Sequence, residues 1–210
     1  MQIFETSTLK GSKIWIWKME EDTESTAIEA GCDQSEDYQK LKSKRRREWA
    51  HIRHLLKLHY PTSRIAYTEE GRPYLENDTK SISIAHTGDF ACIMVNTTGS
   101  PVGIDIEKRS VGKDGTAKVL RVAPKFMVPE ELALKPTDDD ALNALLAWTT
   151  KEALYKIGGK HLWDFQEAIR ITEINISGNE GNGKVLDIAK NISYDIEFRI
   201  WDDFVMASIG

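Results

Sequence analysis

The pattern of apolar and polar positions predicts two long helices. In Tyr38–Tyr60, apolar side chains recur at three- and four-residue spacings until Pro61 stops the pattern. Ala141–Ile157 follows a run of aspartates that can cap a helix start, and two glycines beginning at Gly158 end it. Further helical segments are expected within Glu20–Asp37, within Lys118–Met127 and after Pro129.

Period-two alternation predicts antiparallel strands. Ser81–Ala85 and Phe90–Val95 flank a compact turn at residues 86–89 and read as a β-hairpin, and Val102–Glu107 is the next strand. The other expected strands are Lys13–Lys18, Ala168–Ile176, Lys184–Ile188, Tyr194–Ile200 and Phe204–Ile209. Turns or loops are expected at residues 69–73, 108–115, 179–183 and 202–203. Helices and hairpins without regular βαβα alternation indicate the α+β class.

Composition narrows the class of protein further. The chain has 210 residues, enough for one large domain or two small ones, and its net charge of −5 disfavours a general nucleic-acid binder. No apolar run approaches the ~20 residues that span a bilayer. With only two cysteines, one of them Cys92 in an apolar run that predicts a small buried side chain, we expect a reduced, cytoplasmic protein.

Two carboxylates on one strand are the first candidate site. Asp105 and Glu107 are two residues apart, so both point to one face, while Ile104 and Ile106 point to the other, into an expected core. Paired carboxylates repel each other, and a divalent cation that prefers oxygen, magnesium or manganese, would remove the repulsion. The alternative is an ordinary solvent-facing side of a strand.

The second long helix carries another acid and a base. Glu152 and Lys156 are four residues apart and share a face, which begins with Trp148 one turn earlier. An ordinary surface ion pair is the alternative, but an aromatic on the same stripe favours partial burial. A partly buried carboxylate beside a metal could act as ligand or general base.

A basic helix and a histidine suit a polyanion. One face of Tyr38–Tyr60 is densely charged, as expected for a nucleotide with several phosphates or simply for a solvated helix face. Its basic residues are Lys40, Lys42, Lys44, Arg45, Arg46, Arg47, Arg53 and Lys57. His86, in the expected hairpin turn, is either structural or a second anion contact.

In combination these segments resemble the 4′-phosphopantetheinyl transferase superfamily. GIDIEK (Gly103–Lys108) followed by WTTKEALYK (Trp148–Lys156) resembles its paired signature. GRPYL (Gly71–Leu75) resembles its Gly-Lys-Pro motif with Arg for Lys, and SISIAHTGDFA (Ser81–Ala91) resembles its strand ending in Ser-His. The resemblance runs from about Arg45 to Gly159, and the chain length is similar to that of the monomeric, surfactin-synthetase-activating type.

The resemblance implies two similar α+β halves related by a pseudo-twofold axis, with coenzyme A in the cleft between them. The halves would be residues 1–99, with the basic helix and the coenzyme A phosphate contacts, and residues 100–210, with the metal site and the catalytic helix. Such enzymes, of the holo-acyl-carrier-protein synthase kind, transfer the 4′-phosphopantetheine arm of coenzyme A to a serine of an acyl or peptidyl carrier protein. The reaction depends on magnesium and releases adenosine 3′,5′-bisphosphate.

The resemblance also implies residue roles in the second half. Asp105, Glu107 and Glu152 would hold Mg²⁺, with Mn²⁺ as the alternative metal. Glu152 would take the proton from the attacking serine, and Lys156 would stabilise the pyrophosphate. Asp105, Glu152 and Lys156 thus form the expected catalytic set.

Coenzyme A contacts are expected in the first half, in addition to Lys156. They involve the Gly71–Arg72 motif, Ala85 and His86, together with Arg46 and Arg53 of the basic helix. Ala85 stands where the family usually has serine, so one hydroxyl contact is missing, a loss of about 0.5–1.5 kcal/mol in binding.

Lys151 precedes Glu152 and faces another way, which suggests a structural or a partner-facing role. With Lys160, just past the helix end, it is the candidate contact for an acidic carrier protein; plain solvated lysines are the alternative. The rival functions are a homologue without turnover, which the three carboxylates and Lys156 disfavour, and a nucleic-acid-binding module that uses the basic helix.

Overall fold

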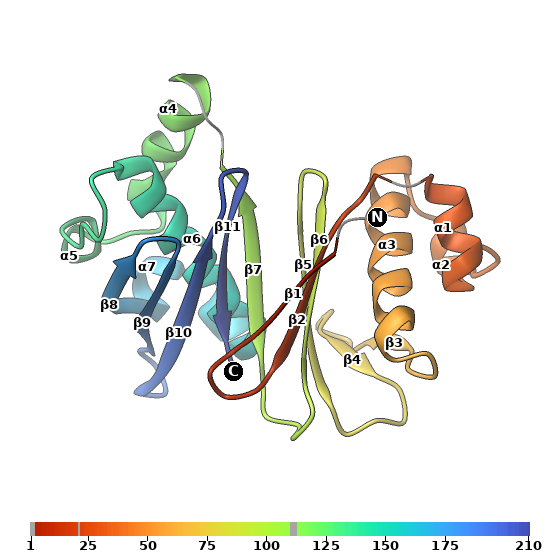
Figure 1. Cartoon of the computed structure of the whole chain (residues 1–210). Coiled ribbons are helices and arrows are strands. Elements are labelled where there is room, and N and C mark those ends of the chain that lie inside the picture. The colour runs from red at the N-terminus through yellow and green to blue at the C-terminus, as the bar shows by residue number, and fades with distance from the viewer. Residues whose placement is uncertain (1–2, 21, 110–112) are drawn as a thin grey trace. The chain divides into compact units, whose positions relative to one another are not determined.

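The chain forms two compact units. The computed structural model describes residues 3–20, 22–109 and 113–210. One unit is Met1–Pro101 and the other is Val102–Gly210, and each combines an antiparallel sheet with helices (Figure 1). Antiparallel hairpins with helices packed on a sheet face confirm the α+β class.

The sheet of the first unit has the strand order β1-β2-β6-β5, and every neighbouring pair is antiparallel. A separate hairpin pairs β3 with β4. The strands are β1 (Ile3–Ser7), β2 (Lys13–Lys18), β3 (Ile65–Tyr67), β4 (Pro73–Leu75), β5 (Ser81–Thr87) and β6 (Phe90–Asn96).

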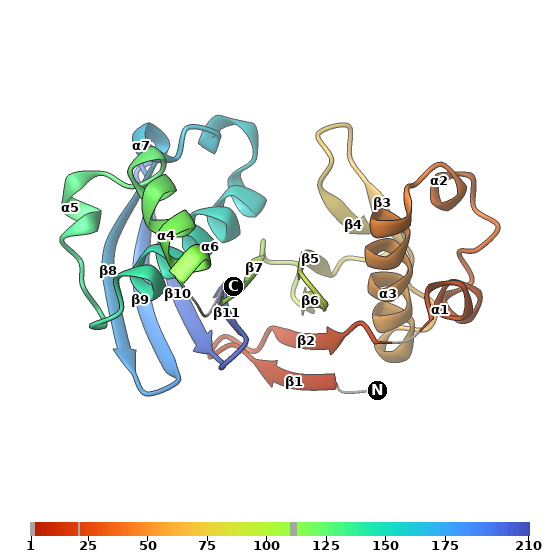
Figure 2. The ribbon, with the colours of Figure 1, turned by 90° about the horizontal axis from the view of Figure 1, so that it is seen from above.

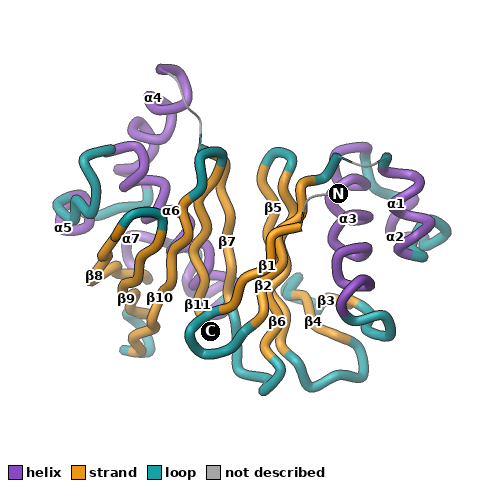
Figure 3. The backbone as a smooth tube through the Cα atoms, viewed as in Figure 1, coloured by secondary structure: helices purple, strands orange, loops and turns teal. Residues whose placement is uncertain are grey.

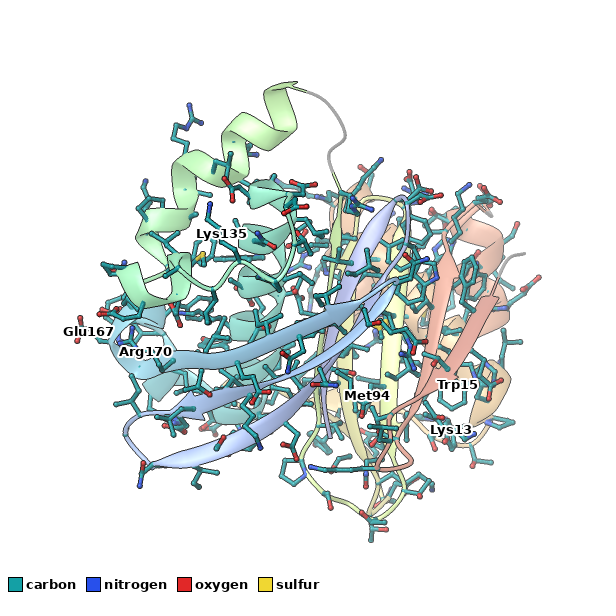
Figure 4. All side chains as sticks on the ribbon, turned by 60° about the vertical axis from the view of Figure 1, so that its left-hand side comes forward. Lys13, Trp15, Met94, Lys135, Glu167 and Arg170 are labelled. Carbon is teal, nitrogen blue, oxygen red and sulfur yellow. The ribbon has the colours of Figure 1, made fainter. Side chains whose placement is uncertain are left out.

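Three helices complete the first unit: α1 (Thr23–Ala30), α2 (Glu36–Gln39) and α3 (Ser43–His59). Helix α3 lies against one face of the sheet, and α1 and α2 pack on the side of α3 that faces away from the sheet (Figure 2). Trp15, labelled on β2 in Figure 4, belongs to the buried cluster between α3 and the sheet, together with Leu55 and Ile93. Burial of these large side chains is the main force that holds α3 in place.

The sheet of the second unit has the order β7-β11-β10-β9-β8, again antiparallel throughout (Figure 3). The strand β7 therefore pairs with β11, which is distant in sequence. The strands are β7 (Gly103–Lys108), β8 (Ile169–Ser177), β9 (Glu180–Asp187), β10 (Ile192–Ile200) and β11 (Phe204–Ile209).

Helix α6 (Asp140–Gly158) forms the core of the second unit. Leu146 and Leu154 of this helix pack with Phe198 and Val205 of the sheet, and all four are fully buried. The other helices are α4 (Lys113–Val122), η1 (Ala123–Lys125), α5 (Pro129–Leu132), η2 (Lys160–Leu162) and α7 (Phe165–Ala168). Among the residues that the structure describes, no helix has both the length and the apolar character needed to cross a membrane.

The first predicted long helix is in fact two. Ser35 caps α2 by accepting a hydrogen bond from the Tyr38 amide, and α3 begins only at Ser43. The Tyr38 ring is fully buried beside α1 and α3, which anchors the short helix independently. Prediction of one continuous helix from Tyr38 was therefore wrong, because local capping at Ser35 and burial of Tyr38 set a different start.

Several strand boundaries also differ from the prediction. Strand β5 runs through Thr87, so His86 lies on a strand opposite Ala91 rather than in the turn. Strand β9 starts at Glu180, where a turn was expected. The strands β1, β3 and β4 were not predicted, and the expected loop at residues 108–115 is shortened by β7 and by α4, with residues 110–112 outside the described part. Cys92 is fully buried, as predicted.

Candidate active site

The candidate site depends on an unusually close approach between β7 and α6. A Cβ atom at Gly103 would lie 2.0 Å from the carbonyl oxygen of Ala153 and 3.0 Å from Cγ1 of Ile157. Only glycine allows the backbone of the strand to come this close to the helix. The carboxylates of β7 and the charged residues of α6 are thereby brought to one place.

Asp105 and Glu107 share the sheet face that α6 covers. Their cross-strand partners on β11 are Ala207 and Val205, which both belong to the hydrophobic core around the helix. Directly opposite residues in an antiparallel pair share a face. Asp105 is only 8% exposed, which excludes the solvent-facing alternative for this residue.

The isoleucines of β7 occupy the opposite face. Ile104 and Ile106 are fully buried and point away from the carboxylates, as predicted. The core around α6, however, lies on the carboxylate side of the sheet. Burial of the isoleucines confirms the expected core on their side, and both faces of β7 are therefore covered.

Lys156 joins α6 to β7. Its Nζ donates to Oδ1 of Asp105 at 2.8 Å and to the carbonyl oxygen of Ile104 at 2.7 Å. Only 25% of the Lys156 side chain and 11% of the Asp105 side chain are exposed. Lys156 thus pairs across the strand–helix junction, in a partly buried place that is no ordinary surface ion pair, and its charge also acts on Glu152, one helical turn away.

Trp148 fixes the second carboxylate. Its indole Nε1 donates to Oε1 of Glu107 at 3.1 Å. The ring itself packs against Phe126 and Phe165, at centroid distances of 5.1 Å and 5.6 Å. The aromatic start of this helical stripe is therefore a hydrogen-bond donor to β7 as well as part of the core.

Burial raises the pKa of Glu152 from 4.5 to about 7, and the negative charge of Asp105 contributes in the same direction. The positive charge of Lys156 acts against this rise, and Glu107 reinforces it. A carboxyl with a pKa near neutrality can accept and release a proton at physiological pH. Perturbation by burial and by specific charged neighbours is typical of functional sites.

Lys151 does not face solvent. Its side chain is fully buried, and Nζ donates to Oε2 of Glu131 at 2.7 Å and to the carbonyl oxygen of Phe126 at 2.7 Å. Desolvation lowers the pKa of this lysine. The expected contact with a carrier protein is therefore wrong for Lys151, and its structural alternative is confirmed. Lys160 is exposed.

In the first unit, His86 lies in a small charged cluster at the start of α3. Its Nε2 is 3.2 Å from Nη1 of Arg45 and 3.4 Å from Oε2 of Glu48, and Arg45 also bonds Glu48 at 3.1 Å. The Glu48 side chain is 8% exposed and the Arg45 side chain 66%. Arg45 was part of the predicted basic face, but its pairing with His86 gave no signal in the sequence.

Arg46 and Arg53, the two arginines expected to contact coenzyme A, make contacts within the first unit. Arg46 donates to the carbonyl oxygen of Gln39 at 2.8 Å, which ties α2 to α3. Arg53 stacks on Trp49, with its guanidinium carbon 3.3 Å from the ring centroid, and burial lowers its pKa. Both side chains thus serve packing within the unit, and neither is brought to His86 by a contact described here.

The hairpin motif and Ala85 complete the predicted set. Gly71, with φ of +84°, and Arg72 are exposed at the turn between β3 and β4. The Arg72 amide donates to Oγ1 of Thr68 at 3.3 Å. Ala85 is 2% exposed and, by strand alternation, points to the face opposite His86.

The described residues contain no group of three His, Cys, Asp or Glu side chains placed to hold a metal ion as they stand. The donor chemistry of Asp105, Glu107 and Glu152 nevertheless fits a hard cation, since all their donor atoms are oxygens. Burial and, after it, the negative charges of Asp105 and Glu107 raise the pKa of Glu152 to about 7. A cation would offset the repulsion among these carboxylates, and Lys156 supplies part of the compensation by pairing with Asp105.

Comparison with known proteins identifies a family model and a similar protein. Residues 101–208 match the sequence model of the 4′-phosphopantetheinyl transferase superfamily. A Haemophilus influenzae protein named "Putative 4′-phosphopantetheinyl transferase" is 36% identical over 101 residues, which cover 46% of this chain and 41% of that protein. The family match spans half of the chain and includes both β7 and α6, and the protein therefore belongs to the 4′-phosphopantetheinyl transferase superfamily.

Proposed function

We propose that the protein transfers the 4′-phosphopantetheine arm of coenzyme A to a serine hydroxyl of an acyl or peptidyl carrier protein. The serine oxygen forms a bond to the phosphorus of the arm, and the bond to adenosine 3′,5′-bisphosphate breaks. The observation that carries the proposal is the junction of β7 and α6, where Asp105, Glu152 and Lys156 meet under partial burial. Family membership supports this reaction.

Glu152 is the proposed general base. A serine hydroxyl must lose its proton as it attacks, and a carboxylate with a pKa of about 7 holds that proton far better than an ordinary glutamate would. Proton transfer to Glu152 also removes one negative charge from the acidic cluster. In the metal-free protein this relieves part of the repulsion among the carboxylates.

Lys156 is the proposed partner of the pyrophosphate. Its ammonium group already lies between Asp105 and the backbone of β7, so it is held in place before substrate arrives. Preorganised positive charge stabilises the negative charge that builds up on a leaving phosphate. The proposed ligands for Mg²⁺, or alternatively Mn²⁺, are Asp105, Glu107 and Glu152; a metal bound there supplies charge neutralisation for the pyrophosphate.

The proposal also covers the subtype of the enzyme and the roles of the two halves of the chain. The chain would be a monomer of the two-half type, with residues 1–99 contributing phosphate contacts and residues 100–210 the chemistry. In the first half, His86 with Arg45 and the exposed Arg72 are the favoured anion contacts, because Arg46 and Arg53 are engaged in packing. The holo-acyl-carrier-protein synthase activity and the carrier proteins served belong to this same proposal.

A direct test incubates the full chain with coenzyme A, Mg²⁺ and apo carrier proteins from fatty-acid, polyketide and non-ribosomal-peptide systems. We expect the mass of the phosphopantetheine arm to be added to at least one carrier. The addition should disappear when the carrier serine is replaced by alanine, when the metal is chelated, or when Glu152→Gln replaces the wild type.

Two binding measurements distinguish this reaction from the two alternative functions. Coenzyme A binding by calorimetry without modification of any carrier would support a homologue that has lost turnover. Salt-sensitive binding to an unrelated DNA duplex, with no coenzyme A binding, would support the nucleic-acid module instead. Either result would overturn the proposed transfer reaction.

A further inference from the structure

The fully buried ion pair between Lys151 and Glu131 lies beside the candidate site without being part of it. Both side chains are 0% exposed, which is exceptional for charged residues. An apolar pair of similar size would often give equal stability, so a buried ion pair is weak evidence for a purely stabilising role. What its atoms contact suggests a more specific task.

Lys151 donates hydrogen bonds to oxygen atoms of several segments that surround α6. Besides Glu131, its Nζ donates to the carbonyl oxygens of Phe126 at 2.7 Å and Phe165 at 2.9 Å, with that of Ile169 at 3.3 Å. An ammonium group has three donors, so its capacity is fully used. The backbone positions of Phe126 and Phe165 are thereby fixed relative to the helix.

Glu131 extends the same network to the sheet. Its Oε1 accepts from the Ile171 amide of β8 at 2.8 Å, and Oε2 accepts from the Val128 amide at 3.0 Å. Each oxygen of the buried carboxylate therefore has a hydrogen-bond partner of its own. The pair connects α6 with α5, β8 and the starts and ends of the short helices on either side.

Phe126 and Phe165 are also the two residues whose rings pack on Trp148. Their carbonyl groups are held by Lys151, and their rings hold the indole, whose Nε1 donates to Glu107 at 3.1 Å. A continuous set of contacts therefore leads from the buried pair, through two phenylalanines, to a carboxylate of the candidate site. Thr149 and Thr150, which lie between Trp148 and Lys151 on the helix, are buried as well.

We infer that Lys151 and Glu131 are positioning residues: they fix Phe126 and Phe165 so that Trp148 presents its indole N–H to Glu107. They touch neither substrate nor the reacting atoms. These contacts do not depend on the proposed reaction, whereas the expected effect on turnover rests on the proposed function. The test therefore measures the position of Trp148 and the rate of turnover separately.

The structural readout is the indole ¹⁵N–¹H resonance of Trp148, assigned by its loss in Trp148→Phe. Lys151→Met keeps the apolar stem but removes the donors, and should shift this resonance towards the position of an indole that lacks its carboxylate acceptor. Glu131→Gln keeps an acceptor for the Ile171 amide and should produce a smaller shift in the same direction. Glu131→Gln also decides the case if Lys151→Met does not fold.

Asn143→Ala is the matched control. Asn143 is a buried polar residue of the same helix, but its side chain bonds the backbone and hydroxyl of Thr137 instead. This variant should lose thermal stability without moving the Trp148 resonance. A folded Lys151→Met or Glu131→Gln protein with an unmoved resonance, or an equal movement in Asn143→Ala, would overturn the inference.

The second readout is the turnover number kcat, which should fall if Trp148 no longer orients Glu107. Loss of a group that orients a site residue typically lowers activity about 10–100-fold. We expect that loss in kcat for Lys151→Met, with the KM for coenzyme A nearly unchanged, and partial recovery in Lys151→Arg. A moved resonance together with an inactive wild type would refute the proposed function and leave the positioning network standing; wild-type kcat in a folded Lys151→Met would refute the positioning role.

Discussion

Each unit has a cluster of acidic and basic side chains where a long helix meets an antiparallel strand, and the two clusters differ in burial. In the first, Arg45 has a 66% exposed side chain although its partner Glu48 is buried. In the second, the paired side chains of Lys156 and Asp105 are 25% and 11% exposed. Similar charges are thus placed in different dielectric surroundings.

This difference decides what each cluster can do. Exposed charges are screened by water and salt, so the cluster around Arg45 and His86 suits reversible contact with a dissolved anion. Partial burial strengthens charge interactions, and it raises the pKa of Glu152 to about 7. The proposed proton transfer is therefore assigned to the second cluster, and the proposed anion contact to the first.

Removal of the base should have the largest effect. Glu152→Gln keeps the shape of the side chain but cannot accept a proton, and general-base catalysis typically contributes about 10²–10⁴-fold. We expect kcat for carrier modification to fall by that factor while the dissociation constant of coenzyme A, measured by calorimetry, changes little. Equal losses in both quantities would show that Glu152 mainly binds substrate and would remove the contrast between the clusters.

The second largest effect is expected when β7 is forced away from α6. A Cβ at Gly103 would lie 2.0 Å from a backbone oxygen, which cannot move aside cheaply, so Gly103→Ala should lower the free energy of unfolding by about 3 kcal/mol. Gly11→Ala is the control: its φ is +85° but the space around it is open, so only backbone strain of about 1 kcal/mol is expected. Similar denaturation midpoints for both variants would contradict the close-approach argument.

The raised pKa of Glu152 predicts a specific dependence of stability on pH. Below the ordinary value of 4.5 the residue is protonated in both states; as pH rises towards 7 it ionises only in the unfolded chain, so stability is lost. Glu152→Gln cannot lose a proton. After allowance for its partial exposure, the metal-free variant should exceed the wild type by on the order of 1–2 kcal/mol at pH 8. At pH 4 that advantage should vanish.

Urea unfolding at both pH values measures this difference. A stability difference that is the same at pH 4 and pH 8 would mean that burial and neighbouring charges do not perturb Glu152.

A smaller effect is expected from the exposed cluster. His86→Ala should weaken coenzyme A binding by about 1 kcal/mol, roughly fivefold, and leave kcat at saturation close to that of the wild type. Arg72→Ala should behave in the same way. Lys57→Ala, at the opposite end of α3, is the control and should bind normally. A large fall in kcat for His86→Ala would place this residue in the chemistry and blur the division.

The smallest effect concerns the carrier protein. With Lys151 buried, Lys160 is the remaining candidate of the two lysines, and Lys160→Glu should raise the KM for an acidic carrier about threefold at low salt. The difference should shrink as salt is added, because screening removes only an attraction that exists. Lys184→Glu on β9 is the matched charge reversal, and an equal change there would assign the effect to overall charge.

Much of the second unit could be predicted from its sequence because local signals agree there. Asp139 caps α6 and Gly159 ends it, as the pattern indicated. The strand β9 was partly missed because Gly181 and Gly183 are typical of a turn. A Cβ at these residues would lie 2.4 Å and 2.2 Å from carbonyl oxygens of β8, so both glycines mark close pairing of backbones near an irregular register.

In the candidate site, too, features with a local cause could be predicted from the sequence, and contacts between distant segments could not. The facing of Asp105 and Glu107 comes from strand alternation and was predictable. The partner of Lys156 was not, since Asp105 lies on a distant segment. Burial of Lys151 had a readable signal: it lies four residues after Ala147 and three before Leu154, in the apolar stripe of the helix.

The pairing of β7 with β11 has a consequence for how the protein folds during its synthesis. The whole of α6 and the meander of β8, β9 and β10 separate these two strands along the chain. A ribosome that has released the acidic strand must still synthesise all of those elements before the strand can find its neighbour. Contacts this distant in sequence form late and slow folding. The sheet that carries Asp105 and Glu107 should therefore be completed, and the proposed activity acquired, only after synthesis has passed β11.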